Sequence, residues 1–393
     1  MQWRDVFPAV QYASVWEPHF FANHAAISAS SHNSSAALSL SLQDEDPALD
    51  VASKHVIDLL QQFYRTGIAH IPIFVTRDWC HLILEQLGTP PPPKQEQQQS
   101  REQFISWERT QRADALLSAM HLMDVLQARK MPFELPRPNA RTYRLVLEMY
   151  ARHQQQQPSS SSLDDDDDDD KASLAVALRA RDWVLRMENE YRMAADLSLK
   201  PSVIEWNLVL QTYAQSPCTD RARQALAVLT QHMLQGDSGS STTDMQLVDA
   251  TSFLFLARAC GHAVPNAQAA EAGAHCAAQV WDLLMEKDAL RQRIVPTLKS
   301  HFYTTMLQSI RHLTRSDLRE RMFEQLFDGA RAHGKVNSLL VREFLINARP
   351  LALVELAMGV DRLSAVKGLS PAQAASKLVH IMPPEWTQHR DGN

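Results

Sequence analysis

The chain has 393 residues, of which 45% are hydrophobic and only 11 are Gly, so it can bury a large core. Such low glycine usage argues against β-rich and dinucleotide-binding folds, whose turns and phosphate loops use Gly heavily. The formal net charge of −6 is accounted for by the acidic run 164–170. The charge balance therefore neither requires nor excludes a nucleic-acid partner.

Cysteine usage and hydropathy indicate a soluble intracellular protein. The 4 Cys are scattered, which is typical of reduced thiols rather than of a disulfide framework. No apolar run approaches the roughly 20 residues of a membrane-spanning helix.

The N-terminal segment 1–46 is rich in Ser, Ala and His, and it is predicted to be disordered unless the sequence is part of a longer gene product. A transit peptide should be rich in Arg and poor in acidic residues, whereas here Arg4 stands alone and Glu17 breaks the pattern. Helices are expected at about 48–64 and 76–87, each ended by a Gly.

Three polar inserts interrupt the helical pattern. They are 89–100, 153–171 and 235–246, and they are rich in Pro, Gln, Ser or Asp. Such compositions cannot bury surface, so we expect solvated loops outside the packed helices. The Asp run in the second insert is not expected to hold a metal, because a metal site needs carboxylates fixed by a fold.

The rest of the chain is predicted to be helical, with no convincing strand pattern. Helical periodicity covers 101–130, 172–197, 202–215, 220–234, a helix containing 253–257, about 267–287, a cycle restarting at Pro296, 317–333, a weaker cycle from Val336, and short helices at 351–358 and 371–381. We therefore expect an all-α chain with a repeat array over 47–349 and a helical cap and tail over 350–393.

One helix occurs twice in this sequence. Residues 143–151 (YRLVLEMYA) align without a gap on residues 206–214 (WNLVLQTYA), and Pro138 stands in the same place as Pro201. The identities include both buried and outward positions, which amphipathicity alone does not explain. This is an internal repeat, whose aromatic residue is expected to be buried between neighbouring repeats.

These helix starts resemble the pentatricopeptide repeat. Pro138-Asn-Ala-Arg-Thr-Tyr143 matches its Pro-x-x-x-Thr-Tyr opening, and Pro201-Ser-Val-Ile-Glu-Trp206 is a variant with Trp for Tyr. The sequences ending at Met233 and Met285 resemble the end of its second helix. The resemblance covers about 105–348. It departs from the family's spacing of about 35 residues where inserts intervene, and around Pro296 the aromatic arrives two residues late. Tetratricopeptide spacing is not visible.

The resemblance implies a right-handed α-solenoid whose first helices line a groove for single-stranded RNA in mitochondria or chloroplasts. It further implies a non-catalytic role in organellar RNA processing, stability or translation. In the family, two residues per repeat select a base. The first role would fall to Arg144, Asn207, Leu254 and Thr304, and the second to Ser202, Asp249, Lys299 and Asn337.

Two of these combinations use residue types that the family pairs with bases, namely Asn207 with Asp249 and Thr304 with Asn337. The first is expected to favour a pyrimidine, and uracil in particular. Arg144 could instead contact phosphate. Additional phosphate contacts, or an ordinary solvated face, are offered by Arg311, Arg315, Arg319, Arg321, Arg331 and Lys335.

Enzymatic signatures are not found in the sequence. Cys260, His262, His275 and Cys276 lack the Cys-x-x-Cys spacing of a zinc site, and no phosphate loop or nucleophile elbow is present. We expect no catalysis, no cofactor, no metal, no small-molecule substrate and no membrane association. The alternative to RNA binding is an α-solenoid scaffold whose groove docks a partner protein.

Overall fold

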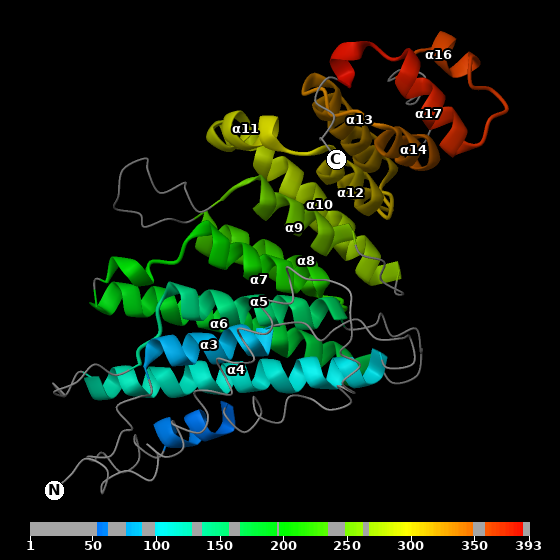
Figure 1. The fold of residues 1–393 in the computed structure, drawn as a ribbon. Helices are drawn as coiled ribbons and strands as arrows, with labels where there is room; N and C mark the ends of the chain where they lie inside the picture. The colour runs from blue at the N-terminus through cyan, green and yellow to red at the C-terminus, as the bar shows by residue number, and fades with distance from the viewer. Residues whose placement is uncertain are drawn as a thin grey trace, which may run out of the picture. The chain divides into compact units, whose positions relative to one another are not determined.

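The computed structural model describes residues 53–61, 76–88, 99–127, 136–156, 166–194, 196–234, 248–261, 267–348 and 358–387. Every regular element in these ranges is a helix, so the expected all-α class is confirmed for the part of the chain described (Figure 1). The predicted segment 1–46 and nearly all of the expected helix 351–358 lie outside these ranges.

The chain divides into two compact units, Met1–Met149 and Tyr150–Asn393, with the boundary inside one helix. The first unit contains a helical stretch at 53–61, α3 (Arg77–Gly88), α4 (Gln99–Gln127) and residues 140–149 of α5 (Ala140–Gln156). α3 packs on α4. The buried core of this first unit includes Ile83, Leu84, Leu117, Met120 and Tyr143.

The second unit is a succession of helices ending in a C-terminal cap. After α6 (Asp166–Ala194) come α7 (Val203–Gln215), α8 (Arg221–Val228), α9 (Ala250–Gly261), α10 (Ala267–Glu286), α11 (Asp288–Ile294), α12 (Ser300–Ile310), α13 (Ser316–Ala332), α14 (Ser338–Asn347), α16 (Val360–Ser364) and α17 (Pro371–Ile381). Short turns of other helical types lie at Leu197–Leu199, Leu229–Met233, Val295–Thr297 and Pro384–Trp386.

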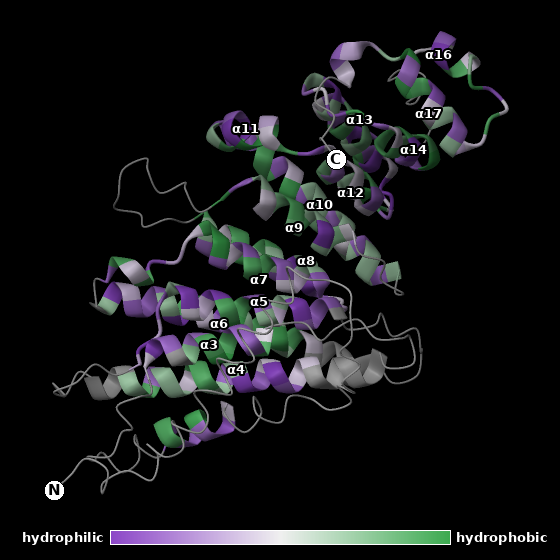
Figure 2. Cartoon of the chain, in the orientation of Figure 1, coloured by the Kyte–Doolittle hydropathy of each residue, from purple (hydrophilic) through white to green (hydrophobic). Residues whose placement is uncertain are grey.

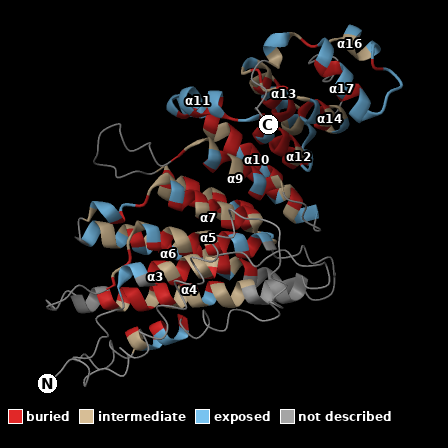
Figure 3. Ribbon diagram, viewed as in Figure 1, coloured by how far each residue is buried: buried red, intermediate tan, exposed pale blue. Residues whose placement is uncertain are grey.

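Helices of this unit pack in a repeating order. α7 contacts α9, α9 contacts α12, and α12 contacts α14, while α8 contacts α10. Each of α7, α9 and α12 also packs against the helix that follows it, so three helical hairpins lie in sequence. Figure 2 shows apolar residues running along these helices, and Figure 3 shows buried residues concentrated on them.

The aromatic residue repeated in each first helix is buried in the packing between helices. Tyr143, Trp206, Phe253 and Tyr303 are each at most 1% exposed. The expected burial of Tyr143 and Trp206 is therefore confirmed. Large aromatic side chains at this position supply much of the apolar surface that each helix removes from water.

Ser202 caps the start of α7. The Ile204 amide donates to Ser202 Oγ at 3.2 Å, and the Ser202 amide donates to the Glu205 carboxylate at 2.9 Å. This capping box satisfies amides that a helix cannot pair internally. It gives α7 a defined first turn directly after Pro201.

Two of the predicted inserts are shorter in the structure than expected. α5 continues to Gln156, because His153 and Gln154 are buried, and α6 begins at Asp166. Acidic residues are favoured in the first turn of a helix by its dipole, so part of the Asp run is helical. The first insert is also shorter, since α4 begins at Gln99. Residues 235–246 lie outside the described ranges.

The late aromatic near Pro296 has a structural cause. The short helix α11 and the turn Val295–Thr297, which were not expected, precede α12. α12 begins only at Ser300, which places Tyr303 early in its first turns. The helical cycle therefore restarts at Ser300 rather than at Pro296.

Candidate functional site

A polar cleft of about 400 Å³ opens within the second unit, on the first helices α7, α9 and α12 and the C-terminal end of α5. Its lining residues are Gln154, Gln155, Gln211, Ala214, Gln215, Pro217, Phe255, Arg258, Gly261, His301, Thr305 and Gln308. The cleft lies along the middle and C-terminal halves of α7 and α9.

Helix periodicity places these side chains on one open face. On α7, Trp206, Leu210 and Tyr213 are buried, whereas Gln211 and Gln215, four residues apart, are only partly covered. Residues four apart lie one above the other on a helix surface. The polar face of the amphipathic helix therefore becomes one wall of the cleft.

The chemistry of the lining is dominated by amides. Among the lining residues that the structure describes, five Gln side chains are joined by the Arg258 guanidinium and the Phe255 ring, and none is Asp or Glu. The Arg258 guanidinium lies 6.0 Å from the centre of the Phe255 ring. Such a surface can donate and accept hydrogen bonds, contact one anion and offer an apolar ring face.

The wall at Gln154 is held by a buried network. Gln154 Nε2 donates to the Ser173 carbonyl at 2.7 Å, and Ser173 Oγ donates to Gln154 Oε1 at 3.0 Å. Ser173 Oγ is also 2.6 Å from Ser216 Oγ. These contacts join α5, α6 and the end of α7, so this side of the cleft is preorganised.

The floor of the cleft is held by a buried arginine and a glycine. Arg221 donates from Nε to the Ala259 carbonyl at 3.0 Å and from a terminal nitrogen to the Ser216 carbonyl at 2.8 Å, which ties the end of α7 to the end of α9. At Gly261 a Cβ would stand 2.7 Å from Ser309 Oγ. The absence of a side chain there lets α9 approach α12 closely.

The structure brings the predicted pair Asn207 and Asp249 together. Asn207 Nδ2 donates to Asp249 Oδ1 at 3.1 Å, and Ser252 Oγ donates to Asn207 Oδ1 at 2.7 Å. The Ser252 amide also donates to Asp249 Oδ1 at 2.9 Å, at the start of α9. Asn207 is only 8% exposed. This pair joins α7 to α9 and does not line the cleft.

The remaining predicted residues also occupy helix starts or helix packing. Thr304 is buried and donates to the Ser300 carbonyl at 3.1 Å. Asn337 accepts from the Leu340 amide at 2.8 Å and caps α14. Ser202 belongs to the capping box, Lys299 is exposed just before α12, and Arg144 and Leu254 are half-buried on α5 and α9. None of them lines the cleft.

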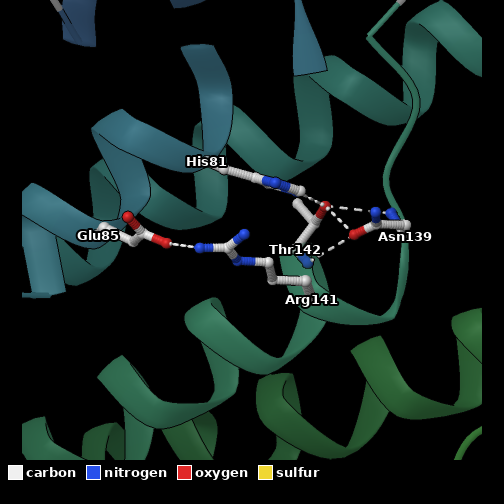
Figure 4. Close-up of polar contacts among 5 residues, drawn as sticks. All are labelled: His81, Glu85, Asn139, Arg141 and Thr142. Atoms are coloured by element: carbon white, nitrogen blue, oxygen red, sulfur yellow. Dashed lines mark hydrogen bonds and ion pairs between the residues drawn. The ribbon is translucent and has the colours of Figure 1, made fainter. Parts of the chain in front are cut away.

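The first unit contains the same kind of junction (Figure 4). Thr142 donates to Asn139 Oδ1 from its amide and from its hydroxyl, each at 3.1 Å, and His81 Nε2 lies 2.7 Å from Thr142 Oγ1. Arg141 forms an ion pair with Glu85 beside it. Burial lowers the pKa of His81, and the charges of Arg141 and Arg77 lower it further, against Asp78 and Glu85.

The two junctions share one pattern that the sequence interpretation missed. An Asn or Asp stands just before a helix, a hydroxyl residue follows three positions later, and a polar side chain of an earlier helix contacts that hydroxyl. We call this arrangement the cap brace. Its local signal, Asn139 with Thr142 and Asp249 with Ser252, is visible in the sequence.

Several predicted phosphate contacts interact with neighbouring groups instead. Arg315 pairs with Asp317 at 2.8 Å, and Arg331 pairs with Asp328 at 2.8 Å while lying over the Trp386 ring. Arg319 donates to the Leu313 carbonyl at 3.1 Å. These local contacts reduce the charge available to a polyanion.

The Cys and His residues near α9 and α10 are not arranged for metal binding. Cys260 and Cys276 are buried, and burial raises the pKa of both thiols, while His262 lies outside the described ranges. In the described part of the chain, no three His, Cys, Asp or Glu side chains are grouped closely enough to hold a metal ion.

Within the same described ranges, none of the helices has the length and apolar character needed to cross a membrane. No family model, curated protein or solved structure matches this chain.

Proposed function

We propose that this chain is a non-catalytic helical-repeat protein that binds single-stranded RNA in the polar cleft. The observation that carries this proposal is the composition of the described lining, in which five Gln amides, Arg258 and Phe255 stand without a carboxylate. Unpaired bases are recognised through hydrogen bonds to their edges and by stacking, and both kinds of group are available here.

The order of helices supports an extended ligand. α7, α9 and α12 lie next to one another in turn, and α12 lies next to α14. We propose that these hairpins form an α-solenoid of pentatricopeptide type, in which neighbouring first helices present a continuous surface. Such a surface suits a strand whose successive bases meet successive repeats.

The cleft is a better candidate for the RNA contact than the cap brace. Asn207 already uses both ends of its amide within the protein, with Ser252 and Asp249 as partners. To select a base such as uracil, Asn207 would have to give up one of these contacts or use only its second N–H. We propose that the brace orients α7 and α9 and that the cleft side chains contact the RNA.

The biological role that follows is positioning or protecting a transcript. A binding site without catalytic groups can cover a segment of RNA or keep it unpaired for other factors. By analogy with the family that the repeats resemble, we propose organellar RNA processing, stability or translation as the process, in mitochondria or plastids.

A protein-binding scaffold is the second candidate, and exposed apolar side chains favour it. Ile204 on α7 is 46% exposed, and Leu339 and Ile346 on α14 are 38% and 45% exposed. Exposed apolar side chains on a helix can dock the apolar face of a partner helix. Protein partners could therefore bind beside the RNA or in its place.

Fluorescence anisotropy with a randomised single-stranded RNA tests the first candidate. The Arg258→Ala variant is expected to bind several-fold more weakly than the unmodified chain. Arg291→Ala is the matched control, because Arg291 is an exposed arginine paired with Asp288 on α11 and does not line the cleft. Failure of the unmodified chain to bind any single-stranded RNA would refute the proposal.

A further inference from the structure

The cleft contains little positive charge for a site that binds a polyanion. Of the lining residues in the described part of the chain, Arg258 is the one Lys or Arg, and it is exposed. His301 also lines the cleft, and its ring nitrogens can take part in hydrogen bonds.

Amides and an aromatic ring line the cleft beside Arg258. Gln211 and Gln215 on α7 and Gln308 on α12 are half-buried, and Phe255 on α9 is half-buried beside Arg258. Amides can both donate and accept, as base edges require, and a ring face stacks on any base.

One acceptor in the cleft has no partner in the structure. The Oε1 atom of Gln215 is buried and accepts no hydrogen bond within the described residues. A buried acceptor without a donor is unfavourable, and an exocyclic amino or imino group of a base would satisfy it. Gln154, by contrast, is fully engaged with Ser173 and serves as a wall.

We propose that the cleft holds RNA mainly through its bases, with Arg258 as the single phosphate contact, so that binding is largely insensitive to salt. This inference rests on the proposed RNA-binding function and adds the part of the nucleotide that is recognised. The contacts belong to the middle and C-terminal halves of α7 and α9, away from the helix starts where the base-selecting residues were predicted.

The charge count sets the expected salt dependence. For single strands the slope of log affinity against log salt is about −0.7 per neutralised phosphate. One contact therefore predicts a loss of about 2.6-fold between 50 and 200 mM salt. Six phosphate contacts would predict a loss of roughly 300-fold over the same range.

The test measures the dissociation constant of a single-stranded RNA at several salt concentrations for four chains. The unmodified chain and Arg291→Ala are expected to give slopes near −0.7, and Arg258→Ala a slope near zero. Phe255→Leu should weaken binding several-fold at an unchanged slope. Circular dichroism verifies that each variant is folded.

A strand of equal length and charge with abasic positions separates base contacts from phosphate contacts. It is expected to bind at least about tenfold more weakly than the normal strand. A slope steeper than about −3, or equal affinity for the abasic strand, would overturn the inference and leave RNA binding itself intact. Absence of binding at any salt concentration would instead overturn the proposed function.

Discussion

Replacing Asn207 by Ala should destabilise the fold, because Asn207 is the central side chain of a cap brace. Its amide nitrogen donates to Asp249 at 3.1 Å, and its oxygen accepts from Ser252 at 2.7 Å. The side chain is only 8% exposed, so water does not readily replace these partners. The substitution removes both bonds and leaves the surrounding helices in place.

The size of the effect follows from the two bonds. A hydrogen bond to a charged carboxylate contributes about 1.5–3 kcal/mol, and a neutral one contributes about 0.5–1.5 kcal/mol. Ser252 Oγ keeps a second acceptor, Asp249 Oδ1 at 3.0 Å, which reduces the cost of losing Asn207. We therefore expect Asn207→Ala to lower the free energy of unfolding by about 2–3 kcal/mol.

Urea unfolding followed by circular dichroism measures this loss. Ser252→Ala and the double variant complete a mutant cycle, and we expect the two residues to be coupled by about 1 kcal/mol. Gln279→Ala, at an exposed position of α10, is the control and should change stability by less than about 0.5 kcal/mol. A loss below about 0.5 kcal/mol for Asn207→Ala, with additive effects, would refute the role of the brace.

Three further predictions concern packing and pH. Trp206 is 1% exposed, and its ring stacks on His232 with centres 5.2 Å apart. Trp206→Ala should therefore lower the free energy of unfolding, measured in urea, by about 3–5 kcal/mol. A loss under about 1 kcal/mol would contradict the burial of this ring. Burial lowers the pKa of His153 from 6.5 to about 4, so the folded state resists protonation of this side chain. The free energy of unfolding should therefore fall by up to about 3 kcal/mol as the pH drops from 6.5 to 4. His153→Asn should reduce this pH dependence, and an unchanged pH profile of the variant would show that His153 does not cause it. Gly261→Ala should separate α9 from α12 and lower the melting temperature, since its Cβ would meet Ser309; an unchanged melting temperature would show that the contact yields freely.

The elements that sequence reasoning located well are those with local signals. The start of α7 depends on Ser202 and Glu205, three residues apart, which form a capping box in the structure. The repeated aromatic position marks the buried face of each first helix, from Tyr143 to Tyr303. Capping and amphipathicity act within a few residues, so one sequence is enough to predict them.

The elements that were missed depend on contacts between distant residues. The cap braces join side chains 45 and 61 positions apart, and only the two residues at the helix start carry a local signal. The helix α11 follows α10 after a single residue, Lys287, so its periodicity merges with that of its neighbour. Long-range pairing is decided by packing, which sequence periodicity does not encode.

The candidate site could be predicted only as far as the helices that carry it. The first helices were expected to bear the ligand-contacting residues, and the cleft lies on them. The residues chosen, such as Asn207 and Thr304, are buried in helix contacts. The cleft side chains, such as Gln211 and Arg258, are ordinary solvent-facing residues of amphipathic helices until packing brings α7 and α9 together.

Photocrosslinking of the purified chain to single-stranded RNA, followed by mass spectrometry of the crosslinked peptides, tests the central claim most directly. The account predicts crosslinks in the peptides of α7 and α9 that line the cleft, centred on Phe255, and their loss in excess unlabelled strand. Crosslinks confined to other surfaces, or none above the level given by a non-binding protein, would contradict it.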